Sequence, residues 1–144
     1  MIDLRLLQEK APDYIACFND DCALHDHCLR WQVGQVPESS SLLRTIVNPH
    51  HPSVQQDRCE YYRDDQLVRV GIGMVNFFHD MPHYIELAIK KDIIRHFNRT
   101  CYYRMRNGTI PVSPDAQAVI ADICRRHGWT AEPRYDSYAE HYLW

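Results

Sequence analysis

The four cysteines nearest the amino terminus are the residues whose type and spacing could do chemistry: Cys17, Cys22, Cys28 and Cys59. The first three are spaced C-x4-C-x5-C, and the fourth follows after thirty intervening residues. Thiolates are preferred ligands of zinc, of Cu(I) and of iron-sulfur clusters, and four of them complete either a tetrahedral zinc site or a cluster. We therefore predict one metal site formed by these four cysteines, with zinc as the first candidate.

The spacing leaves the identity of the metal open. It lacks the C-x2-C pair of common zinc sites, and it matches neither of the usual ferredoxin patterns. An iron-sulfur or thiol redox protein is therefore one alternative. A metal-free protein-interaction module is another, because cysteine also occurs in protein cores as a small apolar residue.

Two histidines and two further cysteines are also candidates. His25 and His27 lie between the second and third cysteines, where they could replace a ligand, bind a second metal or remain solvated loop residues. Cys101 and Cys124 fall at apolar positions of predicted helices, so we expect them to pack in the core.

No catalytic constellation is recognisable, so no catalytic residue is predicted. The chain contains no H-E-x-x-H helix, no G-x-S-x-G elbow and no P-loop. Cysteine and histidine of a nucleophilic pair meet in space rather than in sequence, and no such pair stands out among the nine histidines.

The composition is that of an ordinary folded protein, with 45% apolar and 24% charged residues. The first residues lack the basic segment and the unbroken apolar run of an export signal. There is no run of about 18 or more apolar residues, so we expect no membrane-spanning helix. These features predict a cytoplasmic protein, in whose reducing environment metal ligation is favoured over disulfides.

The elements that must position these residues divide the chain in two. Residues 1–63 are predicted to be irregular and stapled by the metal, with one short apolar run at 42–47 that forms a strand or a buried extended segment. Residues 64–144 are predicted to form a helical bundle, with helices at about 64–79, 84–97, 99–106 and 113–127. Gly71 and Gly73 weaken the first helix, while Asn98 and Ser113 are suited to cap the last two.

The predicted fold class is therefore mainly α, with at most a short strand pair. We expect the irregular cysteine-rich segment to pack on the small helical bundle in one compact unit. The final residues are rich in aromatic side chains that can pack back on the core: Tyr135, Tyr138, Tyr142 and Trp144.

Residues 82–129 carry a net charge of +4 in a chain whose net charge is -3. Within them, IIRHFNRTCYYRMRNG resembles the second and third helices of repressor-like helix-turn-helix domains, and the resemblance extends over residues 85–128. It places Asp92 where that family has a small residue and His96 where it has its turn glycine. The resemblance implies that four residues contact phosphates and base edges of duplex DNA: Arg99, Thr100, Arg104 and Arg106. Alternatively, the basic segment pairs with the protein's own acidic residues.

Read from end to end, the chain resembles a family of unknown function from gut Bacteroidales whose members have about this length. The likeness rests on C-x4-C-x5-CLR, CEYYR, HFNRTCYYRMRNG with SPDAQ, and the closing YDSYAEHYLW. It implies that Cys17, Cys22, Cys28 and Cys59 belong to a shared pattern. It implies no activity, ligand or catalytic residue.

Together these observations predict a metal-stapled binding or regulatory protein rather than an enzyme. The basic helices within residues 84–128 would contact duplex DNA or a protein partner. Sequence-specific reading of DNA by one modest basic face would require a homodimer, because two half-sites then lie on one face of the duplex.

Overall fold

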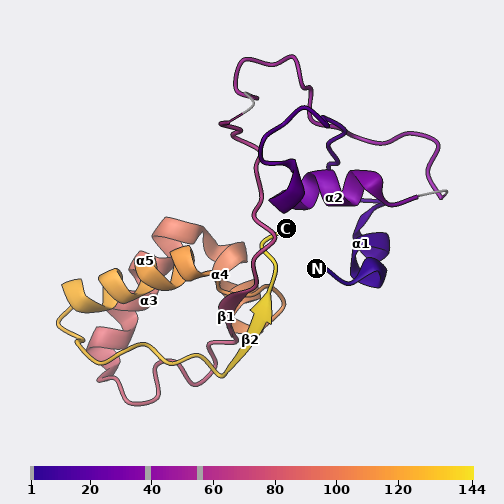
Figure 1. The fold of residues 1–144 in the computed structure, drawn as a ribbon. Helices are drawn as coiled ribbons and strands as arrows, with labels where there is room; N and C mark the ends of the chain where they lie inside the picture. The colour runs from indigo at the N-terminus through magenta and orange to yellow at the C-terminus, as the bar shows by residue number, and fades with distance from the viewer. Residues whose placement is uncertain (1, 38–39, 55–56) are drawn as a thin grey trace. The chain divides into compact units, whose positions relative to one another are not determined.

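The computed structural model describes residues 2–37, 40–54 and 57–144. The described chain forms two compact units, residues 1–66 with 142–144, and residues 67–141. Figure 1 shows the helices and strands in chain order: α1 (Leu4–Lys10), η1 (His25–His27), α2 (Leu29–Gln35), β1 (Val68–Ile72), α3 (His83–Phe97), α4 (Arg99–Arg106), α5 (Pro114–Arg126) and β2 (Ser137–His141). None of the helices in the described part of the chain has the length and apolar character needed to cross a bilayer. Since the one sheet formed by the described strands has only two strands, the mainly α fold class is confirmed.

The first unit has a small apolar core. It is built around α1, whose first turn is capped by the Asp3 carboxylate, and around α2. The buried residues of this core are Ile2, Leu7, Ala11, Leu29, Val33 and Val36. Tyr142 and Trp144 pack against them, as the aromatic tail predicted. The last residues of the chain therefore belong to the unit that begins it.

Outside α1, η1 and α2 the described part of the first unit is irregular, whereas the sequence predicted an irregular segment over residues 1–63 without these helices. Where the structure describes this unit, its β contacts are single bridges rather than ladders: Ala16 with Ile46, Cys28 with Asp64, and Val54 with Cys59. In the apolar run 42–47, Val47 is buried, whereas Leu42 and Leu43 are exposed. The run is therefore buried only at its end.

The helix expected over residues 64–79 is wrong, because β1 occupies residues 68–72. Val68, Val70 and Ile72 are β-branched residues in alternation, which favours a strand. β1 pairs antiparallel with β2 (Figure 1), with Val68 opposite His141 and Ile72 opposite Ser137. The period-3.6 pattern that indicated a helix was accidental, and the partner strand that decides the matter lies near the other end of the sequence.

Gly71 lies at an inward position of β1 where there is no room for a side chain. A β-carbon there would lie 2.5 Å from the ring of Tyr135. The absent side chain lets the buried Tyr135 ring lie directly against the strand. Tyr135 thus joins the core, as its place in the aromatic tail predicted.

The three helices of the second unit are confirmed at nearly the predicted positions. α3, α4 and α5 surround a core that also takes residues from the loop after β1. Its largest fully buried side chains include Met74, Ile89, Ile93, Tyr102, Met105, Ile120 and Ile123.

Asp92 and His127 tie α3 to the end of α5. Asp92 Oδ2 lies 2.7 Å from His127 Nε2, and Arg95 lies 3.5 Å from the other carboxylate oxygen. The hydrogen bond from His127 holds the pKa of Asp92 below its usual value. A carboxylate with a depressed pKa stabilises the fold above its unfolded pKa, and this contribution is lost as the pH falls through the lower folded pKa. The position aligned with a small helix-turn-helix residue thus has a structural role here.

Asn98 is both the cap of α4 and the only residue between α3 and α4. Its side chain accepts a hydrogen bond of 2.9 Å from the backbone N–H of Cys101, as expected of an N-cap. Its backbone has φ 69° and ψ 164°, a region in which glycine is nearly alone. The connection is shorter than the three- or four-residue turn of a helix-turn-helix, and the positive φ falls at Asn98 rather than at His96.

The two roles of Asn98 can be separated by substitution. Asn98→Ala should lower the free energy of unfolding by about 1 kcal/mol, because it removes the cap and keeps a β-carbon. Asn98→Gly should stay within a few tenths of the native value or exceed it, because glycine adopts this backbone freely. Urea unfolding measures both, with Asn107→Ala as a control at a residue of ordinary φ, -82°. Equal stability of the alanine and glycine variants would contradict this account.

Candidate metal centre

All four of the N-terminal cysteines line one small cavity. Its volume is about 20 Å³, and the remaining lining residues are Asn19, His25, Arg30, Trp31, Val47, Val54, Tyr61 and Tyr62. The four cysteines come from segments separated by up to about forty residues of sequence, so the fold of the first unit brings them together. A volume of at least about 10–15 Å³ accommodates one water-sized particle, so the space suits a single small ion.

Backbone hydrogen bonds fix the segments that carry these cysteines. The N–H of Cys17 donates to the carbonyl of Arg30 at 2.9 Å, and Cys28 lies directly before α2. The N–H of Leu29 donates to the carbonyl of Arg63 at 2.8 Å, which holds the start of α2 against the segment after Cys59. These bonds lie at the backbone, so they orient the segments without using the thiols.

The sulfur atoms influence one another electrostatically. Burial raises the pKa of the Cys17 thiol, a backbone hydrogen bond at Asn19 opposes this, and the three other cysteines raise the pKa further. Cys17, Cys28 and Cys59 are free thiols. Among the described residues, no group of three or more His, Cys, Asp or Glu side chains is arranged as a metal-holding set. The cysteines therefore share a cavity, and their side chains are not oriented as a coordination sphere.

The two neighbouring histidines have different positions. His25 lines the cavity, with Nδ1 2.6 Å from the carbonyl oxygen of Cys22 and Nε2 3.0 Å from an Asp26 carboxylate oxygen. Both of its ring nitrogens face oxygen acceptors, so neither is directed at the thiols as a ligand. The side chain of His27 is 72% exposed, which agrees with a solvated loop residue.

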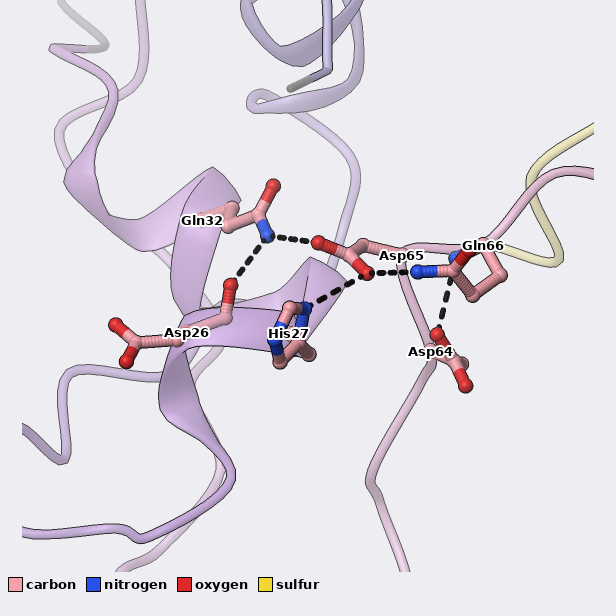
Figure 2. A network of polar contacts seen from close by, with 6 residues as sticks. All are labelled: Asp26, His27, Gln32, Asp64, Asp65 and Gln66. Atoms are coloured by element: carbon pink, nitrogen blue, oxygen red, sulfur yellow. Dashed lines mark hydrogen bonds and ion pairs between the residues drawn. The ribbon is translucent and has the colours of Figure 1, made fainter.

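A polar network around Asp65 holds the start of α2 against the returning chain (Figure 2). Gln32 Nε2 donates to Asp65 Oδ2 at 2.9 Å, while His27 Nδ1 and Gln66 Nε2 lie 3.3 and 3.2 Å from Oδ1. Burial acts to raise the pKa of Asp65, but the hydrogen bonds from Gln32 and its neighbours outweigh it and the pKa is lowered. The charged carboxylate thus helps to position Cys28, which lies beside His27.

Arg30 is a buried residue of the cavity wall that was not predicted from the sequence. Its side chain is only 7% exposed, and arginine is seldom so buried unless it is paired. Its Nε donates to the carbonyl of Tyr61 at 2.8 Å and an Nη donates to that of Ile15 at 3.1 Å. No local pattern marks this arginine as buried, because both carbonyls come from segments distant in sequence.

The residues predicted to contact DNA lie on α4 in the second unit. Arg99, Thr100 and Arg104 are exposed, and Arg106 is partly buried. Arg99 lies over the ring of Tyr103, 5.4 Å from its centroid. Within the described residues, none of the three arginines forms an ion pair with a carboxylate, whereas Arg125 and Arg126 on α5 both contact Asp122.

Cys101 and Cys124 are confirmed as residues of the helical core. Cys124 on α5 is fully buried and Cys101 on α4 is partly buried against the same cluster. Burial raises the pKa of the Cys124 thiol from 9.0 to about 11. Neither residue lines the cysteine cavity.

The raised pKa of Cys124 predicts low reactivity. Only the thiolate is alkylated, and with a pKa of about 11 roughly one Cys124 in a thousand is ionised at pH 8. Iodoacetamide at pH 8 should therefore leave Cys124 unmodified in the native protein and modify the partly exposed Cys101. Raising the pH toward 10 should speed the reaction of Cys124, and mass spectrometry of peptides measures both sites. Equal labelling rates of the two cysteines at pH 8 would show that Cys124 is not shielded.

Comparison with known proteins identifies a family and no activity. A search of curated proteins and a search of solved structures both returned no significant match. A family model described as a family of unknown function (DUF6078) matches residues 1–144. Since the match spans the whole sequence, from the cysteine-rich unit to the closing aromatic residues, the chain belongs to this family of unknown function, DUF6078.

Proposed function

We propose that the protein binds one zinc ion through Cys17, Cys22, Cys28 and Cys59, and that the ion stabilises the first unit. The observation that carries the proposal is the shared cavity, which is lined by four cysteines drawn from separate parts of the sequence. The two remaining cysteines belong to the other unit and do not line this cavity. Chance burial of small apolar side chains does not by itself bring four thiols together.

The size of the cavity favours a single ion over a cluster. A volume of about 20 Å³ has room for one ion among four sulfurs. An iron-sulfur cluster would have to fit its inorganic sulfides and at least two irons inside the same ring of thiolates. Zinc is the usual occupant of a four-cysteine site, with Zn–S distances of about 2.3 Å.

The proposed role is structural because four thiolates complete the tetrahedron. A catalytic zinc keeps one position open for water or substrate, and this set would leave none. The first unit also has reason to need a staple, since the apolar cluster of its described residues contains six buried side chains and their β contacts are single bridges. For a small core, metal binding contributes directly to the free energy of folding.

Elemental analysis tests the proposal. The full chain, purified without oxygen, should contain one zinc per molecule and be colourless. Cys28→Ser and Cys59→Ser should each lose most of the zinc and lower the melting temperature. Cys101→Ser is the matched control, because it changes a partly buried cysteine outside the cavity, and it should keep the zinc.

The other outcomes each contradict a part of the proposal. Brown protein containing iron would replace zinc by a cluster at the same cysteines. Native protein with neither zinc nor iron, together with an unchanged melting temperature for Cys28→Ser, would establish a metal-free unit and overturn the metal proposal.

A second candidate function is duplex DNA binding through α4. It is supported by three arginines on one short helix that have no carboxylate partner among the described residues, two of them exposed. Lys90 of α3 lies 5.8 Å from the ring centroids of both Tyr102 and Tyr103, which adds another cation beside this helix. Cations that are not neutralised within the protein are available to phosphates. The proposal of DNA binding rests on this charge. It does not rest on the connection between α3 and α4, which is shorter than the turn of a helix-turn-helix.

The salt dependence of binding tests this second function. Binding of a fluorescent duplex should be measurable at low salt and weaken steeply as salt rises. Arg99→Ala and Arg104→Ala should each weaken it and reduce the salt slope by about 1. Arg125→Ala is the control, since that exposed arginine already contacts Asp122 at 3.5 Å and should matter less. Undetectable binding at low salt, or an equal loss in the control, would reject DNA binding by α4.

A further inference from the structure

Arg30 is a buried cation without an acidic partner. It is the one charged residue that is buried in the described part of the chain. Its guanidinium donates to two neutral carbonyls and lies over two neutral rings, 4.7 Å from the centroid of Tyr14 and 5.6 Å from that of Tyr61. No carboxylate forms an ion pair with it among the described residues. An unpaired buried charge costs several kcal/mol, so a buried arginine normally has a counter-charge.

The cavity that Arg30 lines is where such a counter-charge could arise. Arg30 shares the cavity wall with all four cysteines. Four thiolates around a divalent ion carry a net charge of -2, whereas four neutral thiols carry none. The rest of the wall includes Trp31, Val47 and Val54, which offer no compensating charge. A metal–thiolate centre would therefore supply the anion that Arg30 lacks.

Arg30 also connects three of the segments that carry the cysteines. Its side chain bonds to the carbonyls of Ile15, two residues before Cys17, and Tyr61, two residues after Cys59. Its own carbonyl accepts the hydrogen bond from the N–H of Cys17, and it follows Cys28 by two residues. Arg30 thus connects its own segment, which carries Cys28, to the segments that carry Cys17 and Cys59. Its guanidinium lies in the wall of the cavity that these cysteines share.

We infer that Arg30 is the built-in counter-charge and positioning residue of an anionic metal–tetrathiolate centre, and that its charge sets the affinity of the site for soft divalent ions such as zinc. This inference rests on the metal-binding proposal. It goes further by naming the charge of the occupied centre and the residue that compensates it.

Substitutions that separate charge from hydrogen bonding test the inference. Arg30→Gln keeps a donor and removes the charge, while Arg30→Lys keeps the charge and loses the planar pair of donors. In the full chain, zinc affinity is measured by competition with a chromophoric chelator. Arg30→Gln should weaken zinc binding by about 10- to 100-fold, the usual effect of losing a group that supports the ligands. Arg30→Lys should bind zinc more tightly than Arg30→Gln.

Arg44 provides a matched control in the same unit. It is a partly buried arginine whose Nη lies 3.3 and 3.4 Å from the carbonyls of Ala11 and Val33, and it does not line the cavity. Arg44→Gln should keep the native zinc affinity. Cobalt substitution adds a spectroscopic readout, because a tetrahedral tetrathiolate has intense thiolate-to-cobalt absorption. The Lys variant should show this band at cobalt concentrations that leave the Gln variant unloaded.

The possible failures are distinguishable. If the native chain binds neither zinc nor cobalt, the metal-binding proposal itself is wrong. If the native chain binds zinc and Arg30→Gln binds it equally well, the site stands and the role of Arg30 is overturned. If the Lys variant is as weak as the Gln variant, or if Arg44→Gln loses as much affinity, the effect is one of packing and the counter-charge is rejected.

Discussion

The hydrogen bonds from the Arg30 guanidinium to the carbonyls of Ile15 and Tyr61 hold together a part of the chain that has little regular structure. Around the cysteine cavity the described backbone makes isolated bridges and turns, and none of its described residues forms a ladder that would fix the segments relative to one another. A buried cation that bonds to both segments takes over that function, and the Asp65 network adds a second clamp at the start of α2. Both clamps are polar, and each depends on a charged side chain that is held in place by hydrogen bonds.

The second unit is stabilised by a different principle. α3, α4 and α5 bury a continuous apolar cluster, and the caps at Asn98 and Ser113 satisfy backbone donors at the helix starts. Its one strand pair joins residues nearly seventy positions apart and receives the ring of Tyr135 above Gly71. The contrast explains why a metal staple is proposed for only one of the units: apolar burial is extensive in the second and slight in the first.

Features that depend on interactions between nearby residues could be predicted from the sequence. Features that depend on residues far apart in the sequence could not. The helices over 83–126 were predictable because their caps, apolar stripes and stop signals are local, as the hydrogen bonds made by Asn98 and Ser113 illustrate. The strand at Val68–Ile72 was not, because its pairing partner lies at Ser137–His141. The same reasoning applies to the candidate site. The cysteines could be chosen from residue type and context, whereas Arg30, Tyr61 and the Asp65 network become neighbours only through the tertiary fold.

The membership of residues 142–144 in the first unit has a consequence for synthesis on the ribosome. The aromatic rings of Tyr142 and Trp144 complete the packing around α1 and α2, yet they are translated after the whole of the second unit. At about 5–20 residues per second, the cysteine-rich segment waits for several seconds with its apolar surface partly uncovered. The packing of the first unit is therefore completed only when Tyr142 and Trp144 are added, after both the cysteine-rich segment and the helical unit have been synthesised.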